Sequence, residues 1–303
     1  PVVSYDIETA GSQITMIGFS RNKQAWVLPF IHHGDSLWSK LQEVECWHLV
    51  KRFLKDNDIP KTAHSASYDN TWLSFYGIEV KNLWMDTMLA WHTLHPELPR
   101  GLDTVASVLT DYTYWKHEGD APDLTTQTHY NGMDCISTAE IATKLHKQLQ
   151  DAGLWQYYCD SVHSLITPVA RVVRHGVSFD EDVRQALRID YTRKYDDVVS
   201  KVKQAVSWPI NVGSPAQVGK LLYDELGLPS IYSRKGKARS TDDKTLAALI
   251  KKVPKSAGII NAILDARSYA KALNTGGDLA VRVDPDGRVR CSYNLAGTEI
   301  GRC

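Results

Sequence analysis

The chain has 303 residues, of which 43% are hydrophobic and 23% charged, and its formal net charge is zero. These values are typical of a globular protein with a sizeable core, and the length suits one large domain or two ordinary ones. No apolar run reaches the roughly 20 residues that a membrane-spanning helix needs. The five cysteines form no C-x-x-C pair, so we expect reduced thiols, no structural zinc, a cytoplasmic location and no membrane partner.

The zero net charge conceals an asymmetry between the two halves of the chain. Residues 1–150 carry 12 Lys and Arg against 18 Asp and Glu, a net charge of −6, and residues 151–303 carry 23 against 17, a net charge of +6. This division indicates two domains with different electrostatic partners, and the basic half is a candidate for contacts with phosphate groups. A chance partition of surface charge is the alternative.

The first half has the pattern of a mixed α/β domain. Short runs of apolar and β-branched residues, separated by turn formers, predict a three-strand meander at residues 2–9, 13–20 and 24–30, and a further strand at 61–64. Apolar residues at helical spacing predict helices at 37–57, 68–76, 85–95, 102–109 and 124–149.

The second half is predicted to be mostly helical. Helices are expected at 154–175, 180–206, 241–252 and 257–273, with Gly176 ending the first of them. Residues 284–287 form a turn signal between strand candidates at 279–283 and 289–293. The pattern places a domain boundary near 150–158, which divides the chain into domains at 1–150 and 151–303.

Asp6 and Glu8 lie two apart in the first predicted strand, so both side chains point to one face. Two carboxylates on one face repel each other unless a cation or protons compensate. An exposed edge strand with two solvated acids is the alternative, and for this pair alone it is the better interpretation.

Three further residues favour a metal site. Asp69 lies at the start of a predicted helix, just after a short strand, and Tyr130 and Asp134 lie one turn apart on another helix. A two-metal phosphoryl-transfer site needs carboxylates that converge from different elements, and a group that positions the attacking water. The five residues together supply these parts.

These segments resemble the three exonuclease motifs of the DEDD superfamily, tyrosine subclass, in the order found in the proofreading domain of family A DNA polymerases. The resemblance implies an RNase H-like fold, with a mixed sheet flanked by helices, in which Asp6, Glu8, Asp69 and Asp134 bind two Mg²⁺ or Mn²⁺ ions and Tyr130 orients the attacking water. The family usually has Asn where this chain has Ser65, which implies a looser grip on the DNA terminus. Asp86 is expected to be a residue that supports the metal site or a helix N-terminal acid.

Residues 214–222, 236–242 and 266–271 resemble segments of the polymerase thumb in that family. Residues 287–302 resemble the start of the palm, and the segments follow the order of the family. The basic residues of a loop, Arg234, Lys235, Lys237 and Arg239, suit contacts with a phosphate backbone, although an ordinary surface loop is the alternative. Arg267 and Lys271 share one helix face and are expected to line a DNA groove or to serve solubility. Arg302 matches an arginine that in the family lies near the primer–template minor groove.

The sequence therefore indicates the N-terminal portion of a family A DNA polymerase, with an exonuclease domain at 1–150 and a helical thumb and the start of the palm at 151–303. We expect a monomer that releases 5′-mononucleotides from DNA 3′ ends, with the single-stranded end at the exonuclease site and primer–template duplex at the thumb. The sequence contains neither the D-Y-S-like nor the H-D-E-like palm motif, so this chain alone is not expected to synthesise DNA. A DNA-binding module with a silent exonuclease fold and a stand-alone exonuclease for RNA are the alternatives.

Overall fold

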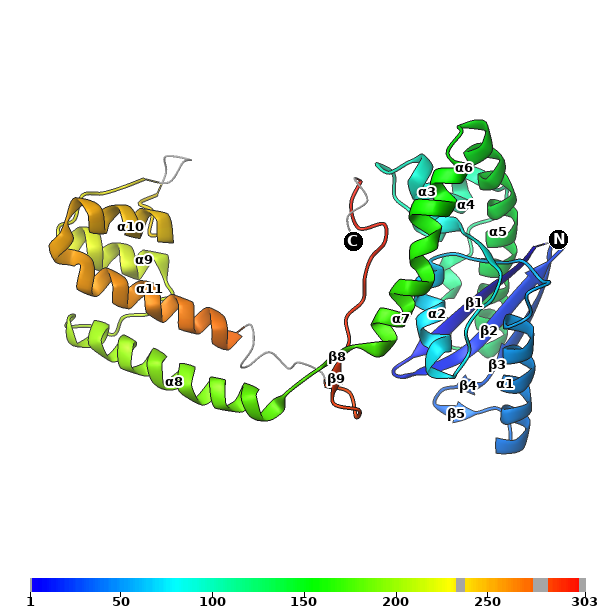
Figure 1. The fold of residues 1–303 in the computed structure, drawn as a ribbon, viewed down its shortest axis with the longest axis horizontal. Coiled ribbons are helices and arrows are strands. Elements are labelled where there is room, and N and C mark those ends of the chain that lie inside the picture. The colour runs from blue at the N-terminus through cyan, green and yellow to red at the C-terminus, as the bar shows by residue number, and fades with distance from the viewer. Residues whose placement is uncertain (1, 233–237, 275–282, 300–303) are drawn as a thin grey trace. The chain divides into compact units, whose positions relative to one another are not determined.

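A computed structural model describes residues 2–232, 238–274 and 283–299, and in this part of the chain no helix is both long enough and apolar enough to cross a membrane. The chain forms two compact units (Figure 1). The first comprises Pro1–Gly176 and Arg290–Cys303, and the second comprises Val177–Val289. The chain thus leaves the first unit after residue 176 and returns to it at residue 290.

A five-stranded mixed sheet forms the centre of the first unit. Its strand order is β3-β2-β1-β6-β7, in which β1 is antiparallel to β2, β2 is antiparallel to β3, and the neighbours β1, β6 and β7 are parallel. The strands span Val3–Ala10 (β1), Gln13–Arg21 (β2), Gln24–Pro29 (β3), Lys61–Ala63 (β6) and Leu83–Asp86 (β7). The predicted meander is confirmed, and a small pair, β4 (Ile31–His32) and β5 (Asp35–Ser36), follows it.

Helices cover both faces of this sheet. The helices up to residue 151 are α1 (Lys40–Leu54), α2 (Ala66–Phe75), α3 (Thr87–Leu94), α4 (Leu102–Leu109) and α5 (Leu124–Asp151). The ring of Phe19 on β2 contacts Phe53 on α1, whereas the neighbouring Gly18 faces α5. Because successive residues of a strand point to opposite faces, α1 and α5 lie on opposite sides of the sheet. The helix predicted at 85–95 begins at Thr87, since residues 85 and 86 complete β7.

The segment after α5 is helical, as predicted, but irregular. It consists of the short pieces α6 (Trp155–Tyr157), η2 (Tyr158–Val162) and η3 (His163–Leu165), followed by α7 (Ile166–His175). Gly176, at φ 63°, ends α7 in the left-handed region that favours glycine. Ile166 joins the core of the first unit, so this unit extends beyond residue 150.

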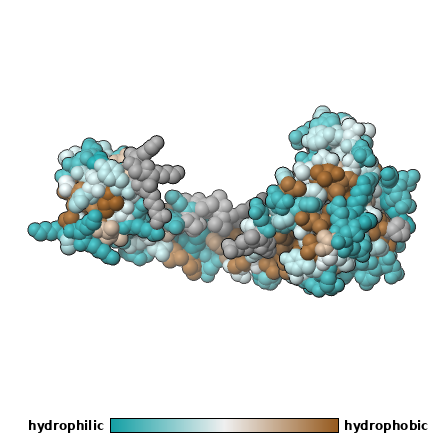
Figure 2. All heavy atoms as spheres, turned by 90° about the horizontal axis from the view of Figure 1, so that it is seen from above, coloured by the Kyte–Doolittle hydropathy of each residue, from teal (hydrophilic) through white to brown (hydrophobic). Residues whose placement is uncertain are grey.

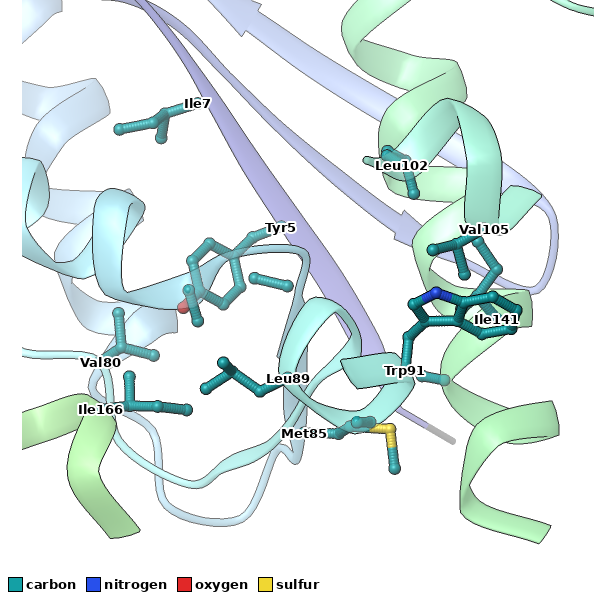
Figure 3. Packing of buried hydrophobic residues seen from close by; sticks show 14 of the residues in the cluster. Tyr5, Ile7, Val80, Met85, Leu89, Trp91, Leu102, Val105, Ile141 and Ile166 are labelled. Atoms are coloured by element: carbon teal, nitrogen blue, oxygen red, sulfur yellow. The ribbon is translucent and has the colours of Figure 1, made fainter. Parts of the chain in front are cut away.

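The core of the first unit lies around β1 and the helices that flank it. Figure 3 shows labelled members of this core, including Tyr5 on β1, Met85 on β7, Leu89 on α3 and Ile166 on α7. Leu295 and Ala296, from the returning end of the chain, are buried in the same core. At about 25 cal/mol per Å² of apolar surface, burial of these side chains is the main stabilising contribution to the fold.

The second unit is mostly helical. It contains α8 (Glu181–Gln204), α9 (Pro215–Gly219), the continuing turn η4 (Lys220–Glu225), α10 (Asp243–Lys252), η5 (Pro254–Ser256) and α11 (Ala257–Ala272). α8 and α11 pack along each other (Figure 1). The helices predicted at 180–206, 241–252 and 257–273 are confirmed, whereas α9 lies between the first two of them, where no helix was predicted.

A short β-ribbon joins the two ends of the second unit. β8 (Val177–Ser178) pairs antiparallel with β9 (Arg288–Val289). The predicted turn at 284–287 is confirmed, since the N–H of Gly287 donates to the carbonyl of Asp284 at 2.9 Å. Most of the strand predicted before it, at 279–282, lies outside the described residues.

In the view of Figure 2, the visible surface of each unit is mainly hydrophilic, with apolar patches. Large exposed apolar side chains in the first unit include Trp26 on β3 and Leu41, Val44 and Leu49 on α1. Exposed apolar residues are common on soluble proteins, so these alone assign no binding function.

Candidate active site

Asp6 and Glu8 lie on β1, the central strand of the sheet. β1 pairs with β2 on one side and with β6 on the other, so the alternative of an exposed edge strand does not hold. Both side chains are on the face toward α5, where the Ser4 hydroxyl donates to the Cys135 carbonyl at 2.6 Å. A register shift between Glu8 and Thr9 marks a β-bulge, a feature that redirects side chains at the end of a strand.

Asp69 reaches β1 from the first turn of α2. β6 pairs with β1 only at Val3 and Ser4, so the edge of β1 is open beyond these residues. Into this opening Asp69 places its carboxylate, whose Oδ1 accepts the backbone N–H of Ile7 at 3.1 Å. Asp69 therefore lies beside the stretch of backbone that separates the two acids of β1.

Asp134 and Tyr130 come from α5, one turn apart, as predicted. Carboxylate oxygens of Asp6, Glu8 and Asp134 all lie within 4.8 Å of one another. Asp69 is not a member of this group. The fold thus gathers three of the four predicted acids tightly, and places the fourth against the backbone of β1.

Burial and mutual repulsion disfavour the charged forms of these acids. Burial, followed by repulsion from Asp69 and Asp134, holds the pKa of Asp6 well above its usual range. Burial and repulsion from Asp134 raise the pKa of Glu8 to about 7. Burial also raises the pKa values of Asp69 and Asp134. Carboxylates that are buried together in this way tend to bind protons or a cation, because either one compensates their negative charge.

Sequence reasoning missed two neighbouring residues that hold Asp134. The indole N–H of Trp115 donates to Asp134 Oδ1, and the ammonium of Lys116 donates to Oδ2, each at 2.6 Å. Burial alone would lower the pKa of Lys116, but attraction to Asp134 outweighs this and raises the pKa above its usual value. The sequence contained a signal, because Lys116 is the single Lys or Arg in the stretch 101–143, which has seven Asp and Glu.

Asn131 is a further residue that sequence reasoning missed. Its side-chain N–H donates to Asp6 Oδ2 at 2.7 Å, and its side chain is fully buried. Sequence reasoning treated Asn131 as a spacer between Tyr130 and Asp134. Because a hydrogen bond to a carboxylate fixes its orientation, Asn131 aligns one β1 acid from the same helix that supplies Asp134.

Asp86 anchors the start of two helices. Its buried carboxylate caps α3 by accepting the N–H groups of Met88 and Leu89, and it also accepts those of Ser65 and Ala66 at the start of α2. Ser65 has φ 67°, in the left-handed region that non-glycine residues rarely adopt. Asp86 thus matches the expected helix N-terminal acid, and it also holds the turn that leads to Asp69.

The site fits divalent cations with hard-ligand chemistry. Its clustered ligand atoms are all carboxylate oxygens, which Mg²⁺ and Mn²⁺ prefer. The charge balance agrees with this, since the acids repel one another and Lys116 compensates only part of their charge. The residues that would hold such ions are Asp6, Glu8 and Asp134, with Asp69 alongside.

The predicted DNA-binding residues lie in varied environments. Arg239 forms an ion pair with Asp224, and Lys271 is exposed on α11. Arg267 donates to the carbonyls of Val212 and Thr241 within the second unit, so its guanidinium is already engaged in packing α11. The other predicted basic residues, Arg234, Lys235, Lys237 and Arg302, lie outside the described residues.

Comparison with known protein families identifies both parts of the chain. Residues 1–150 match the 3′–5′ exonuclease family model, and residues 181–303 match that of DNA polymerase family A. The DNA polymerase I of Synechocystis sp. is 32% identical over 301 residues, which cover 94% of this chain and 30% of that protein. The DNA polymerase I of Rhizobium leguminosarum is 26% identical over 340 residues, which cover 99% of this chain and 33% of that protein.

The fold has a close counterpart among solved structures. The polymerase domain of Pol1 from M. smegmatis, solved with a DNA primer–template and dNTP, matches with a TM-score of 0.78 at 19% identity, over 99% of this chain and 50% of that chain. At this identity the match shows the fold alone.

The first unit thus contains a 3′–5′ exonuclease domain with an acidic cluster of the kind that metal-dependent nucleases use. Residues 181–303 match DNA polymerase family A, and the chain is similar to DNA polymerase I over most of its length. It spans about a third of the length of these curated relatives.

Proposed function

We propose that this chain is a metal-dependent 3′→5′ exonuclease that removes nucleotides from DNA 3′ ends, and that the whole protein uses this activity for proofreading. The observation that carries the proposal is the convergence of Asp6, Glu8 and Asp134 within 4.8 Å, with Tyr130 one turn from the last. The relatives named as DNA polymerase I support DNA as the substrate.

The proposed reaction is hydrolysis of the terminal phosphodiester. Two Mg²⁺ or Mn²⁺ ions, held by Asp6, Glu8, Asp69 and Asp134, would supply positive charge that stabilises the attacking and leaving oxygens. The Tyr130 hydroxyl orients a water molecule for in-line attack. The water releases a proton to solvent as its oxygen bonds to phosphorus. The bond from phosphorus to the 3′ oxygen of the preceding nucleotide breaks, and this 3′ oxygen takes a proton from solvent. The product is a 5′-mononucleotide.

The second unit is proposed to hold the primer–template duplex. Its supporting features are the basic balance of residues 151–303 and the match of 181–303 to the DNA polymerase family A model. We propose that the whole protein carries out template-directed DNA synthesis, as a monomer in the cytoplasm. Ser65 and the basic residues named above are its proposed DNA contacts.

The direct test measures release of mononucleotides from a 3′-labelled single-stranded oligonucleotide, with Mg²⁺ or Mn²⁺ and with EDTA. Asp6→Ala is expected to reduce the rate by at least about 1,000-fold, because the cations lose a central ligand. Asp151→Ala is the matched control, since Asp151 is an exposed acid that pairs with the exposed Lys147 on α5. Equal degradation by wild type and Asp6→Ala would overturn the site assignment.

The same assay distinguishes the alternatives. A chain that neither binds Mn²⁺ nor releases nucleotides is the silent DNA-binding module. A chain that degrades RNA at least as fast as DNA of the same sequence is an RNA exonuclease. The proposed function predicts Mn²⁺ binding and faster degradation of DNA.

A further inference from the structure

Lys116 occupies an unusual position for a lysine. Its ammonium lies 2.6 Å from Asp134 Oδ2 and 3.0 Å from the Tyr130 hydroxyl, and 4.6 Å from the centre of the Tyr130 ring. It comes from η1 (Lys116–Glu118), in the connection between α4 and α5. One cation thus contacts two of the residues that the proposed reaction uses.

Burial distinguishes this contact from an ordinary surface ion pair. The side chain of Lys116 is 19% exposed and that of Asp134 only 5%. Exposed ion pairs hold side chains weakly, because water competes for both charges, whereas a desolvated and hydrogen-bonded pair has a defined geometry. Lys147, which pairs with Asp151 on the same helix α5, is 76% exposed and represents the ordinary case.

Asp134 and Tyr130 depend on Lys116 to different degrees. Asp134 is also held by Trp115, which donates to the other carboxylate oxygen. Among the described residues, Lys116 is the one hydrogen-bond partner of the Tyr130 hydroxyl. The Tyr130 ring also packs against Gly119, where a β-carbon would lie 3.1 Å from a ring carbon. Without Lys116, Asp134 would keep a donor, but the Tyr130 hydroxyl would lose its fixed direction.

We propose that Lys116 is a positioning residue of the exonuclease reaction, which ties the Tyr130 hydroxyl to the metal-binding carboxylate of Asp134. This inference rests on the proposed function and names a residue that the four-acid and tyrosine motif does not contain. Its effect falls on turnover rather than on capture of metal, because the carboxylates that hold the cations keep their other supports. Removal of the positive charge of Lys116 also does not weaken the attraction of the acidic cluster for metal ions.

The first experiment compares Lys116→Met, Lys116→Arg and the control Lys147→Met in the full chain. Lys116→Met is expected to lower kcat about 10- to 100-fold, the range found when a supporting partner of a metal site is lost. We expect KM for the oligonucleotide to change less than about twofold and the dissociation constant of Mn²⁺, measured by electron paramagnetic resonance, not to increase. Lys116→Arg should recover most of the rate, and Lys147→Met should match wild type.

Three results would overturn the proposal. A rise in KM that accounts for the lost activity would make Lys116 a contact for DNA phosphate. Mn²⁺ affinity that falls in parallel with kcat would make it a support of the metal ligands alone. Unchanged kinetics in Lys116→Met would make the contact irrelevant to the reaction. Far-UV circular dichroism, measured separately from Mn²⁺ binding and activity, recognises a variant that fails to fold, and Lys116→Arg then decides whether a positive charge at this position matters.

A double-mutant cycle tests the link to Tyr130 directly. If Lys116 acts through the Tyr130 hydroxyl, Lys116→Met should cost about tenfold or more in the wild-type background but less than about twofold in Tyr130→Phe. Additive losses would contradict the proposal. Absence of activity in wild type, or activity that survives Asp6→Ala, would instead refute the proposed function, so the two failures are distinguishable.

Discussion

Gly18 on β2 faces Asn131 on α5 so closely that a β-carbon at residue 18 would lie 2.1 Å from the Asn131 side-chain oxygen and 2.8 Å from Cys135 Sγ. The lack of a side chain at Gly18 therefore sets how near α5 comes to the sheet. That distance decides whether Asn131 can donate to Asp6 from α5. Gly18 has no side chain that could take part in the reaction, yet it thereby controls the alignment of the acidic cluster.

Gly18→Ala is therefore expected to damage both stability and activity. The added methyl group must displace Asn131 or Cys135, and such overpacking costs about 1–3 kcal/mol in the free energy of unfolding. The exonuclease rate should fall by more than the population of folded protein explains, because Asp6 loses its donor. Urea unfolding and nucleotide release measure the two effects. Gly258→Ala on α11, where a β-carbon meets nothing within 4 Å, is the control and should stabilise by up to about 1 kcal/mol.

Asp86→Asn should destabilise the first unit by about 1–3 kcal/mol, although the two side chains have nearly the same shape. The Asp86 carboxylate accepts four backbone N–H groups, whereas an amide presents donors to some of them and leaves them unsatisfied. Asp123→Asn is the matched control, because Asp123 caps α5 at an exposed position and Asn caps equally well. Equal thermal unfolding temperatures for the two variants would contradict this role.

Stability should depend on pH in a direction set by the raised carboxyl pKa values. Burial is the chief cause that raises the pKa of Glu8 from its usual 4.5 to about 7, and that of Asp86 from its usual 3.8 to about 6, in the folded chain. Between about pH 4 and 7 the folded state therefore binds more protons than the unfolded state, so stability falls as the pH rises through this window. We expect a loss of the order of 1–3 kcal/mol for metal-free protein.

Urea unfolding in EDTA from pH 5 to 8, followed by tryptophan fluorescence, measures this dependence. Mn²⁺ should restore stability at pH 8 more than at pH 5, because it binds the ionised carboxylates. Glu8→Gln should flatten the pH dependence. Stability that rises with pH in EDTA, or the same slope in Glu8→Gln, would show that burial of Glu8 is not the cause.

Ser65→Asn should improve the grip on the DNA terminus without loss of stability. Residue 65 has φ 67°, a conformation that Asn tolerates better than Ser. The longer amide can add a hydrogen bond, which is worth about 1 kcal/mol, or roughly a fivefold decrease in KM for single-stranded DNA. Ser65→Ala should not decrease KM. A KM that is the same in Ser65→Asn and wild type would remove residue 65 from the proposed DNA contacts.

Regular periodicity explains which parts of the site could be predicted from the sequence. Asp6 and Glu8 share a face because a strand alternates, and Tyr130 and Asp134 share one because a helix repeats every 3.6 residues. Trp115 and Lys116 precede α5 in an irregular connection, where no period indicates the direction of a side chain. Their contacts with Asp134 arise from tertiary packing alone.

Packing also explains why the fold was predicted better than the roles of individual basic residues. The predicted face of α11 with Arg267 is present, but whether that guanidinium meets solvent or a carbonyl depends on how α11 packs against the loop at Val212. Similarly, the Gly, Pro and Ser content of 207–243 hides α9, which is stabilised by burial of Val218 in the second unit. The amino-acid composition shows neither the contact of Arg267 with Val212 nor the burial of Val218.

Leu295 and Ala296 complete the core that begins with β1, yet they follow the whole second unit in the chain. During synthesis, the ribosome must therefore translate all of Val177–Val289 before the exonuclease core can acquire its last buried residues. The first unit to start is therefore not the first to be finished, because its last buried residues follow the second unit in the chain. The first unit is thus started before the second unit but completed after it.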